Sequence, residues 1–538
     1  MPLFSRLPPP SRWLRRRNAT QAAHLLCLGI GLAMGSMHLP LDARADTPPG
    51  AVSAPSGPTR LPSLGDSSEI SLGEERRLGD SIMREILRDP DVIDDPVLAE
   101  YVGAMWQRLR EAAKLRGELS LELDEQFAWD MILVRDKSVN AFALPGGYMG
   151  VHLGLIGVVS SQDELASVLA HELSHITQRH IARMLTQQQR QSPLMIGSMI
   201  LGLLAASRSP QAAQAMMVGG QAVAVQTQLN FSRDMEREAD RVGYGVATQA
   251  GFEPSGFVSM FEKLAQASRL NDSGGYPYLR SHPLTTERIA DMQSRQQLLS
   301  VKGTPASVDL VHSLLSARAR VLSQPNVDAL RFFSQDANTQ HATPVRQAAA
   351  LYAGVLADSQ LRELERARQR LASLNLLTQH DPSARELVQL LSAELSLSSG
   401  QALQAVAQLQ ALPPRRTVQL LLAQARIATG LPEQGRLAAQ DMQMFVSANN
   451  RDRTAWDLLG QALGLQGDAL RSLRAQAEAS ALRWEYVGAL DRLKAAQDLA
   501  RDRARNGTLS RGDEMEASII DSRVRVFQSA RREQMLQR

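Results

Sequence analysis

The segment His171-Glu-Leu-Ser-His175 constrains the fold of this chain more than any other feature. It lies within residues 161–185, which read as one helix because Ser161 can cap its start and the residues before His171 are apolar. Histidines four positions apart lie on one face of a helix, so both imidazoles can bind a single Zn²⁺. An apolar helix is largely buried, and buried His and Glu need partners. The pattern predicts a zinc site rather than a chance match on a solvated helix.

Two carboxylates complete the predicted chemistry. Glu172 lies about 100° around the helix from His171, where it can take a proton from an attacking water. A catalytic zinc needs a third protein ligand and an open position, and the best candidate is Glu236, near the start of a second predicted helix. Asp240 faces the same way and could orient a ligating histidine or donate a proton. The alternative for Glu236 is a solvated charge like its neighbours.

His180 is a further histidine near the motif. It stands five residues beyond His175, about 140° away on the same predicted helix. A third histidine that closes such a site usually follows a Gly turn, and the sequence has no Gly there. We therefore predict that His180 is not a ligand but a surface histidine or a partner of a ligand.

Residues 1–45 have the three parts of a secretory signal: a positive region, an apolar stretch, and a small-x-small pattern that predicts cleavage after Ala45. A membrane anchor is the alternative, but the stretch is shorter than the ~20 apolar residues of a span. The signal takes six Arg and one Asp with it, so the 59 basic and 56 acidic residues become 53 and 55. The mature chain is thus expected in the periplasm, without the electrostatic footprint of nucleic-acid binding.

The rest of the chain divides into three predicted regions. Residues 46–70 form a flexible leader rich in Pro, Ser and Gly, residues 71–300 form the metal-site domain, and residues 309–538 form a helical repeat domain with a C-terminal helix. Within residues 71–300, the segments 127–134 and 141–151 read as extended, the second broken by a Pro-Gly-Gly turn. The fold class is therefore mainly α with a small β-sheet.

Glycines mark the helical hairpins of the C-terminal half. Gly400, Gly430 and Gly467 each separate two amphipathic stretches, at spacings that bracket the ~34 residues of a tetratricopeptide repeat. Trp456 and Ala479 fit one such unit best. An irregular helical bundle is the alternative.

Two apolar runs lie between the predicted helices of the metal site, at residues 194–206 and 216–225. Neither reaches the length of a membrane span. They read as a buried helix or a mobile flap, or else as a surface that touches a membrane or a partner.

The chain resembles the HtpX-related family of envelope metalloproteases, and within it the periplasmic members that assist β-barrel assembly. The resemblance covers nearly the whole chain. It rests on the HELSH motif, the repeat domain, and three segments with their neighbours: Asn140 with Ala141-Phe-Ala-Leu-Pro-Gly-Gly-Tyr148, Ser232-Arg-Asp-Met-Glu-Arg-Glu-Ala-Asp240, and Ser281-His-Pro-Leu-Thr-Thr-Glu-Arg-Ile289.

The resemblance implies a helical zincin domain of the gluzincin type, with one Zn²⁺ per chain. It implies that Glu236 is the third ligand and Asp240 a proton donor. Relatives carry membrane spans near the apolar runs, so the short runs here imply a soluble or peripheral protein. The implied partners are unfolded or misassembled outer-membrane proteins as substrates, and the β-barrel assembly machinery through the repeat domain.

The resemblance also places the loop with His282 near the active site. An imidazole there could fill the fourth zinc position and keep the enzyme latent, or donate to the oxyanion of the tetrahedral intermediate. Arg288 competes for the oxyanion role. The structural alternative is a histidine that caps the helix starting near Thr285. We favour the latching role.

A substrate site is expected beside the zinc helix. Residues 140–151 read as an edge strand with which an unfolded chain could pair, residues 149–151 included, although an ordinary hairpin would fit equally. The candidate substrate-binding residues are Asn140, Gly146, Gly147 and Tyr148.

The function expected from the sequence is that of a zinc-dependent endopeptidase of the periplasm, with Glu172 as its general base. The alternative is a chaperone or assembly scaffold whose zinc site is largely latent, since repeat domains chiefly bind other proteins.

Overall fold

The computed structural model describes residues 70–187, 232–269, 275–299 and 309–536. The predicted signal, the leader up to residue 69 and both apolar runs lie outside these residues. Residues 65–538 form one compact unit. In the described part of the chain, no helix is both long and apolar enough to cross a membrane.

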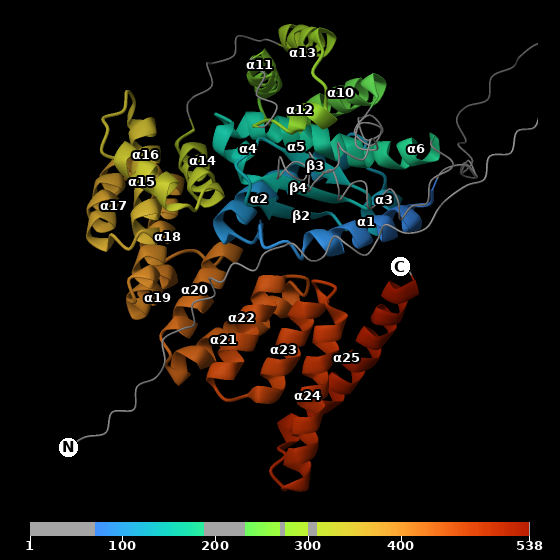
Figure 1. The fold of residues 1–538 in the computed structure, drawn as a ribbon, viewed down its shortest axis with the longest axis vertical. Coiled ribbons are helices and arrows are strands. Elements are labelled where there is room, and N and C mark those ends of the chain that lie inside the picture. Colours follow the sequence, from blue (N-terminus) through green and yellow to red (C-terminus); the bar gives the residue numbers. More distant parts are fainter. Residues whose placement is uncertain (1–69, 188–231, 270–274, 300–308, 537–538) are drawn as a thin grey trace, which may run out of the picture. The chain divides into compact units, whose positions relative to one another are not determined.

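The N-terminal part packs helices around a four-stranded sheet (Figure 1). In chain order its elements are α1 (Leu72–Ile86), β1 (Val92–Ile93), α2 (Pro96–Leu115), α3 (Leu121–Gln126), β2 (Asp130–Val134), β3 (Ala141–Leu144), β4 (Tyr148–His152), α4 (Leu153–Val158), α5 (Gln162–Thr177), α6 (His180–Gln187), α10 (Arg233–Gln249), α11 (Ser255–Arg269), α12 (Tyr278–Ser281) and α13 (Thr286–Leu299). This confirms a mainly α domain with a small sheet.

The strand order of the sheet is β1-β2-β4-β3. β4 pairs in parallel with β2 and antiparallel with β3, so β3 is one of the two edge strands, and it lies against α5. The second extended segment is therefore confirmed as a hairpin. The prediction that residues 149–151 offer an open edge is wrong, because they lie in the central strand and pair on both sides.

The turn of this hairpin depends on two glycines. Gly146 and Gly147 have φ of 75° and 82°, which side chains with a Cβ rarely adopt. A Cβ on Gly146 would come within 2.9 Å of Arg76 Cα, and one on Gly147 within 2.8 Å of Phe127 Cβ. The glycines thus let the turn pack closely against α1 and the start of β2.

The stretch predicted as one helix over residues 161–185 is two helices. α5 begins after Ser161, whose side chain accepts a hydrogen bond from the Glu164 N–H, as predicted. It ends at Thr177, and Arg179 adopts φ of 52° before α6 begins at His180. This left-handed residue turns the chain, so the angle inferred for His180 on a continuous helix is wrong.

The C-terminal half consists of helices, most of which pack mainly against their neighbours in sequence (Figure 1). They are α14 (Leu310–Ser323), α15 (Val327–Asp336), α16 (Pro344–Gln360), α17 (Leu364–Thr378), α18 (Pro382–Ser398), α19 (Ala402–Gln410), α20 (Arg416–Ala428), α21 (Pro432–Ala448), α22 (Arg453–Leu465), α23 (Ala469–Ala481), α24 (Tyr486–Arg505) and α25 (Arg511–Leu536). Gly400, Gly430 and Gly467 end α18, α20 and α22 with positive φ, where hairpin turns were expected. Tetratricopeptide geometry stays a prediction.

Candidate metal centre

Helix α5 carries the two motif histidines on its buried face. His171 and His175 are 2% and 1% exposed, and their Nε2 atoms lie 3.0 Å apart. Leu169 and Leu173 of the same helix are fully enclosed, so the motif lies in the core of the protein. Both imidazoles therefore point at one place, as the i and i+4 spacing predicted.

Helix α10 brings Glu236 to the same place. The helix approaches α5 closely, because a Cβ on Gly243 would lie only 3.0 Å from the carbonyl oxygen of Ala170. The carboxylate oxygens of Glu236 lie 3.5 Å from Nε2 of His171 and 3.5 Å from Nε2 of His175. Glu236 is 1% exposed, so the alternative of a solvated charge is wrong.

His282, which follows α12, completes the cluster. Its Nδ1 lies 3.0 Å from Oε1 of Glu236 and 3.4 Å from Nε2 of His171. The ligand atoms of His171, His175, Glu236 and His282 all lie within 4.8 Å of one another. The ring of Tyr278 stacks on the His282 ring at 4.5 Å between centroids, which fixes the orientation of this imidazole.

This donor set fits zinc. A tetrahedral Zn²⁺ with ligands at about 2.0–2.1 Å holds its ligand atoms roughly 3.3–3.4 Å apart. The five contacts between ligand atoms described above range from 3.0 to 3.5 Å. Three imidazoles and one carboxylate are also ligands that zinc commonly takes in proteins. The four residues would hold the metal ion in a site that His282 closes.

Asp240 lies behind the first ligand. Its Oδ1 is 2.9 Å from Nδ1 of His171, on the ring side away from the cluster. Arg288 binds the same carboxylate with two hydrogen bonds of 2.6 and 2.8 Å and places Nη1 2.7 Å from Glu236. Burial raises the pKa of Asp240, but Arg288 and His171 outweigh it and hold this pKa below its usual value. An ionised Asp240 suits the orientation of His171 better than proton donation.

The same carboxylates act on the ring of His171. Burial alone lowers the pKa of this imidazole, but the neighbouring Asp240 and Glu236 raise it to about 9. Zinc takes only the deprotonated nitrogen, so metal binding would compete with a proton here. Arg288 is fully engaged by the two carboxylates and by the carbonyl of Pro283, a position that does not favour the oxyanion role.

His180 lies beside the predicted ligand His175. It is fully buried, and its Nδ1 lies 2.9 Å from Nδ1 of His175. Its Nε2 lies 3.1 Å from Glu238, which also accepts a hydrogen bond from Arg183. The reversal of the chain at Arg179 brings His180 here, and we find no signal for that turn in the sequence.

The general base candidate lies beside the edge strand. Glu172 is fully buried, and its Oε2 accepts a 3.0 Å hydrogen bond from the backbone N–H of Ala143 in β3. Its Oε1 lies 3.4 Å from Nε2 of His282. The carboxylate therefore stands between the metal ligands and the strand, where it can reach a water at the cluster.

The candidate substrate residues lie elsewhere. The carbonyl of Asn140 accepts a hydrogen bond from the backbone of His152, which extends the hairpin. Tyr148 is fully buried and donates a 2.5 Å hydrogen bond to Asp80 in α1. Together with the turn glycines described above, these residues hold the hairpin against its neighbours and are not brought to the metal cluster.

Comparison with known proteins agrees with this geometry. Residues 103–296 match the model of peptidase family M48. The chain is 31% identical over 455 residues to the β-barrel assembly-enhancing protease of Escherichia coli (strain K12), a match that covers 84% of this chain and 88% of the relative. It is 34% identical over 328 residues to a putative β-barrel assembly-enhancing protease of Vibrio cholerae, covering 60% and 64%.

A more distant likeness covers the metal-site half. The mitochondrial metalloendopeptidase OMA1 of Schizosaccharomyces pombe is 26% identical over 226 residues, which are 42% of this chain and 62% of the relative. The family match, the extent of the bacterial likeness and the four-ligand cluster lead to one conclusion. The chain belongs to peptidase family M48, as a zinc metalloprotease akin to the β-barrel assembly-enhancing proteases.

Proposed function

We propose that this protein is a periplasmic endopeptidase that cleaves misfolded or stalled outer-membrane β-barrel proteins and thereby assists their assembly. The observation that carries the proposal is the likeness over 84% of the chain to a protease whose name states β-barrel assembly. The predicted signal over residues 1–45 supports the location. The repeat domain would contact the assembly machinery, a role for which stacked helical hairpins are suited.

The mechanism assigns a task to each buried group. His171, His175 and Glu236 would hold the zinc ion, with Asp240 orienting His171. Bound zinc polarises the scissile carbonyl and lowers the pKa of the attacking water. Glu172 accepts the proton of this water and returns it to the leaving amine. The substrate backbone lies along β3, whose outer edge pairs with no other strand among the described residues and lies beside α5.

His282 gives the enzyme a latch in this proposal. Its Nδ1 sits among the ligand atoms, so it would fill the position that a catalytic zinc leaves open. Displacement of the loop would then be needed before water can enter. The latching role is supported by the position of His282 Nδ1, 3.0 Å from Glu236. The alternative role of capping the next helix is taken by Thr285, whose hydroxyl accepts a hydrogen bond from the Arg288 N–H.

Replacement of His282 by Ala separates the two roles of this histidine. A latch predicts higher basal cleavage of unfolded protein, whereas an oxyanion donor predicts a kcat lower by about 100-fold or more. Zinc content should be measured in parallel, so that loss of metal is not mistaken for loss of a donor. Unchanged rates with full zinc would contradict both roles.

The proteolytic function is tested with Glu172→Gln. This variant should bind zinc, fail to cleave, and retain uncleaved outer-membrane proteins in a pull-down from envelope extracts. Cells that depend on it should accumulate misassembled β-barrel proteins. A scaffold with a latent zinc site would instead keep its biological role in this variant, and that result would replace the protease proposal.

A further inference from the structure

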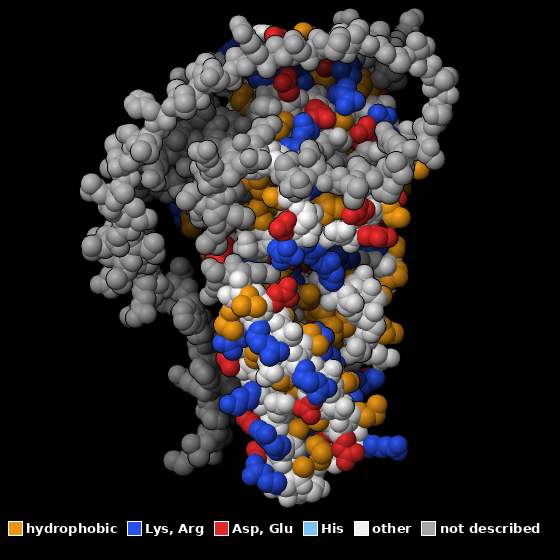
Figure 2. All heavy atoms as spheres, turned by 90° about the vertical axis from the view of Figure 1, so that its right-hand side faces the viewer, with side chains coloured by type: hydrophobic (Ala, Val, Ile, Leu, Met, Phe, Trp, Pro, Cys, Tyr) orange, Lys and Arg blue, Asp and Glu red, His pale blue; other side chains and the backbone are white. Residues whose placement is uncertain are grey.

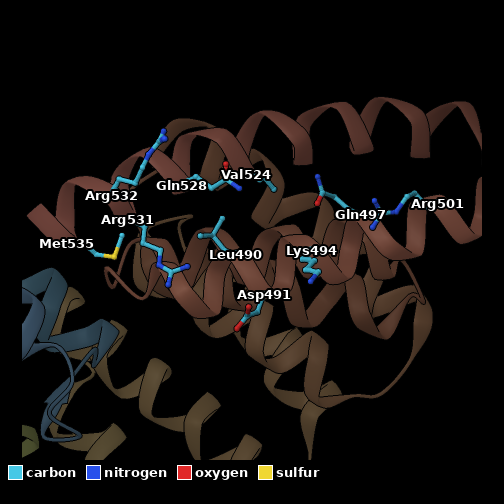
Figure 3. Close-up of a pocket in the computed structure, with 10 residues that line it drawn as sticks. All are labelled: Leu490, Asp491, Lys494, Gln497, Arg501, Val524, Gln528, Arg531, Arg532 and Met535. Carbon is cyan, nitrogen blue, oxygen red and sulfur yellow. The ribbon is translucent and has the colours of Figure 1, made fainter.

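A groove between the last two helices lies apart from the metal centre. It runs between α24 and α25 and has a volume of about 650 Å³. Figure 3 shows its lining side chains in two rows, one from each helix. The lining residues are Leu490, Asp491, Lys494, Gln497, Arg501, Val524, Gln528, Arg531, Arg532 and Met535. Figure 2 shows basic side chains, interspersed with apolar ones, over this lower part of the molecule.

The groove has an excess of positive charge. It contains four basic side chains and a single carboxylate, that of Asp491. Within the part of the chain that the structure describes, Lys494, Arg531 and Arg532 make no ion pair. Other arginines of the same helices do, since Arg523 binds Glu478 at 2.6 Å and is thereby neutralised. These three side chains of the groove therefore carry positive charges that no ion pair within the described residues neutralises.

The apolar lining residues and the length of the groove restrict what can bind. Leu490, Val524 and Met535 add apolar surface between the charges. Lys494 and Arg501 are seven residues apart on α24, a rise of about 10 Å at ~1.5 Å per residue. One phosphate cannot bridge that length. A polypeptide can, because an extended chain advances ~3.3 Å per residue and alternates its side chains.

We propose that the α24–α25 groove binds an acidic linear segment of a partner polypeptide, with apolar side chains against the apolar lining residues and carboxylates at the basic ones. The concave shape favours such a segment over a flat membrane surface. The contact is independent of the zinc site and does not rest on the proteolytic function proposed above. It gives the repeat domain a charge-selective binding site at its C-terminal end.

The test uses the full-length protein and a short fluorescein-labelled peptide of Glu, Leu and Ser residues. Its counterpart carries Lys in place of each Glu. Fluorescence anisotropy should show binding of the acidic peptide alone, weakening as NaCl is raised. The double variant Lys494→Glu/Arg531→Glu should bind about tenfold or more weakly, because both attractions become repulsions.

A matched control comes from the same helix. Arg525 is exposed and does not line the groove, so Arg525→Glu should leave peptide affinity unchanged. The parent, the double variant and Arg525→Glu should hydrolyse casein at equal rates. This result separates the peptide-binding proposal from the proteolytic one. Equal peptide affinity in the double variant and the parent would overturn the proposal. Binding to phosphatidylglycerol vesicles would also overturn it, if the parent sediments with the vesicles, the double variant does not, and the acidic peptide fails to displace the parent from them.

Discussion

At the scale of single residues, each motif imidazole is held through the nitrogen that does not face the cluster. Asp240 lies at Nδ1 of His171, and His180 lies at Nδ1 of His175. Glu238 can accept a hydrogen bond from the Nε2–H of His180. The Nδ1 of His180 then accepts a hydrogen bond from the Nδ1–H of His175. This tautomer leaves the Nε2 lone pair of His175 for the metal. The tautomer of each ligand is thus set by a carboxylate, directly or through one further ring.

Removal of the distant carboxylate should weaken the metal site. In Glu238→Ala, His180 loses its acceptor and the tautomer of His175 is no longer fixed, so zinc affinity should fall by about 10- to 100-fold. Competition with a chromophoric chelator measures this affinity. The control is Asp234→Ala, which removes an exposed carboxylate from the same helix. Equal zinc affinity in the two variants would show that the His180 relay does not tune the metal.

At the scale of elements, the position of β3 matters most. It is an edge strand of the sheet, it packs against α5, and the Ala143 N–H already binds Glu172. Because hydrogen-bonding groups alternate along a strand, Ala141 and Ala143 face outward while their neighbours pair with β4. The strand thus joins two roles, positioning of the general base and presentation of a backbone edge to substrate.

A proline at residue 143 should separate folding from catalysis. Proline is tolerated at an edge position whose N–H faces outward, so Ala143→Pro should keep the sheet. It removes the donor to Glu172, a charge-assisted hydrogen bond worth about 1.5–3 kcal/mol, so kcat/KM should fall roughly 10- to 100-fold. Ala143→Val keeps the N–H and serves as the control. The assignment fails if the folded, zinc-loaded proline variant cleaves casein at the parent rate.

The same elements show how far the sequence predicts this molecule. The spacing of His171 and His175 and the start of α10 are local patterns, and the structure brings these histidines and Glu236 into one cluster, as the patterns predicted. The sequence does not reveal the helix break at Arg179, because a positive φ is usually indicated by a glycine and this position is an arginine. The central place of β4 was also missed, since pairing with β2 joins segments that are distant in sequence and leaves no local trace.

At the scale of the whole molecule, buried charges join helices of the C-terminal half to the part of the chain that carries the metal centre. Arg318 of α14 is 3% exposed and binds Asp95, which also caps α2, at 2.7 Å. The same guanidinium reaches Glu394 of α18 at 2.6 Å. His312, also on α14, places Nε2 2.9 Å from the carbonyl of Val159. These contacts connect the first repeat helices to the elements that carry the active site.

Loss of Arg318 should therefore loosen the packing of α14 and α18 against the part that carries the metal centre. Arg318→Ala leaves the buried carboxylate of Asp95 and the partly buried one of Glu394 without their cation, which costs about 3–5 kcal/mol. The free energy of unfolding in urea should fall by that amount, and limited proteolysis should cut between α13 and α15 at lower protease concentration. In the control Arg368→Ala, an exposed ion pair with Glu365 is lost, and the change should stay below about 1 kcal/mol. If the two variants unfold alike, α14 and α18 are held to the metal-site part by apolar packing, and the buried ion pairs serve only to align them.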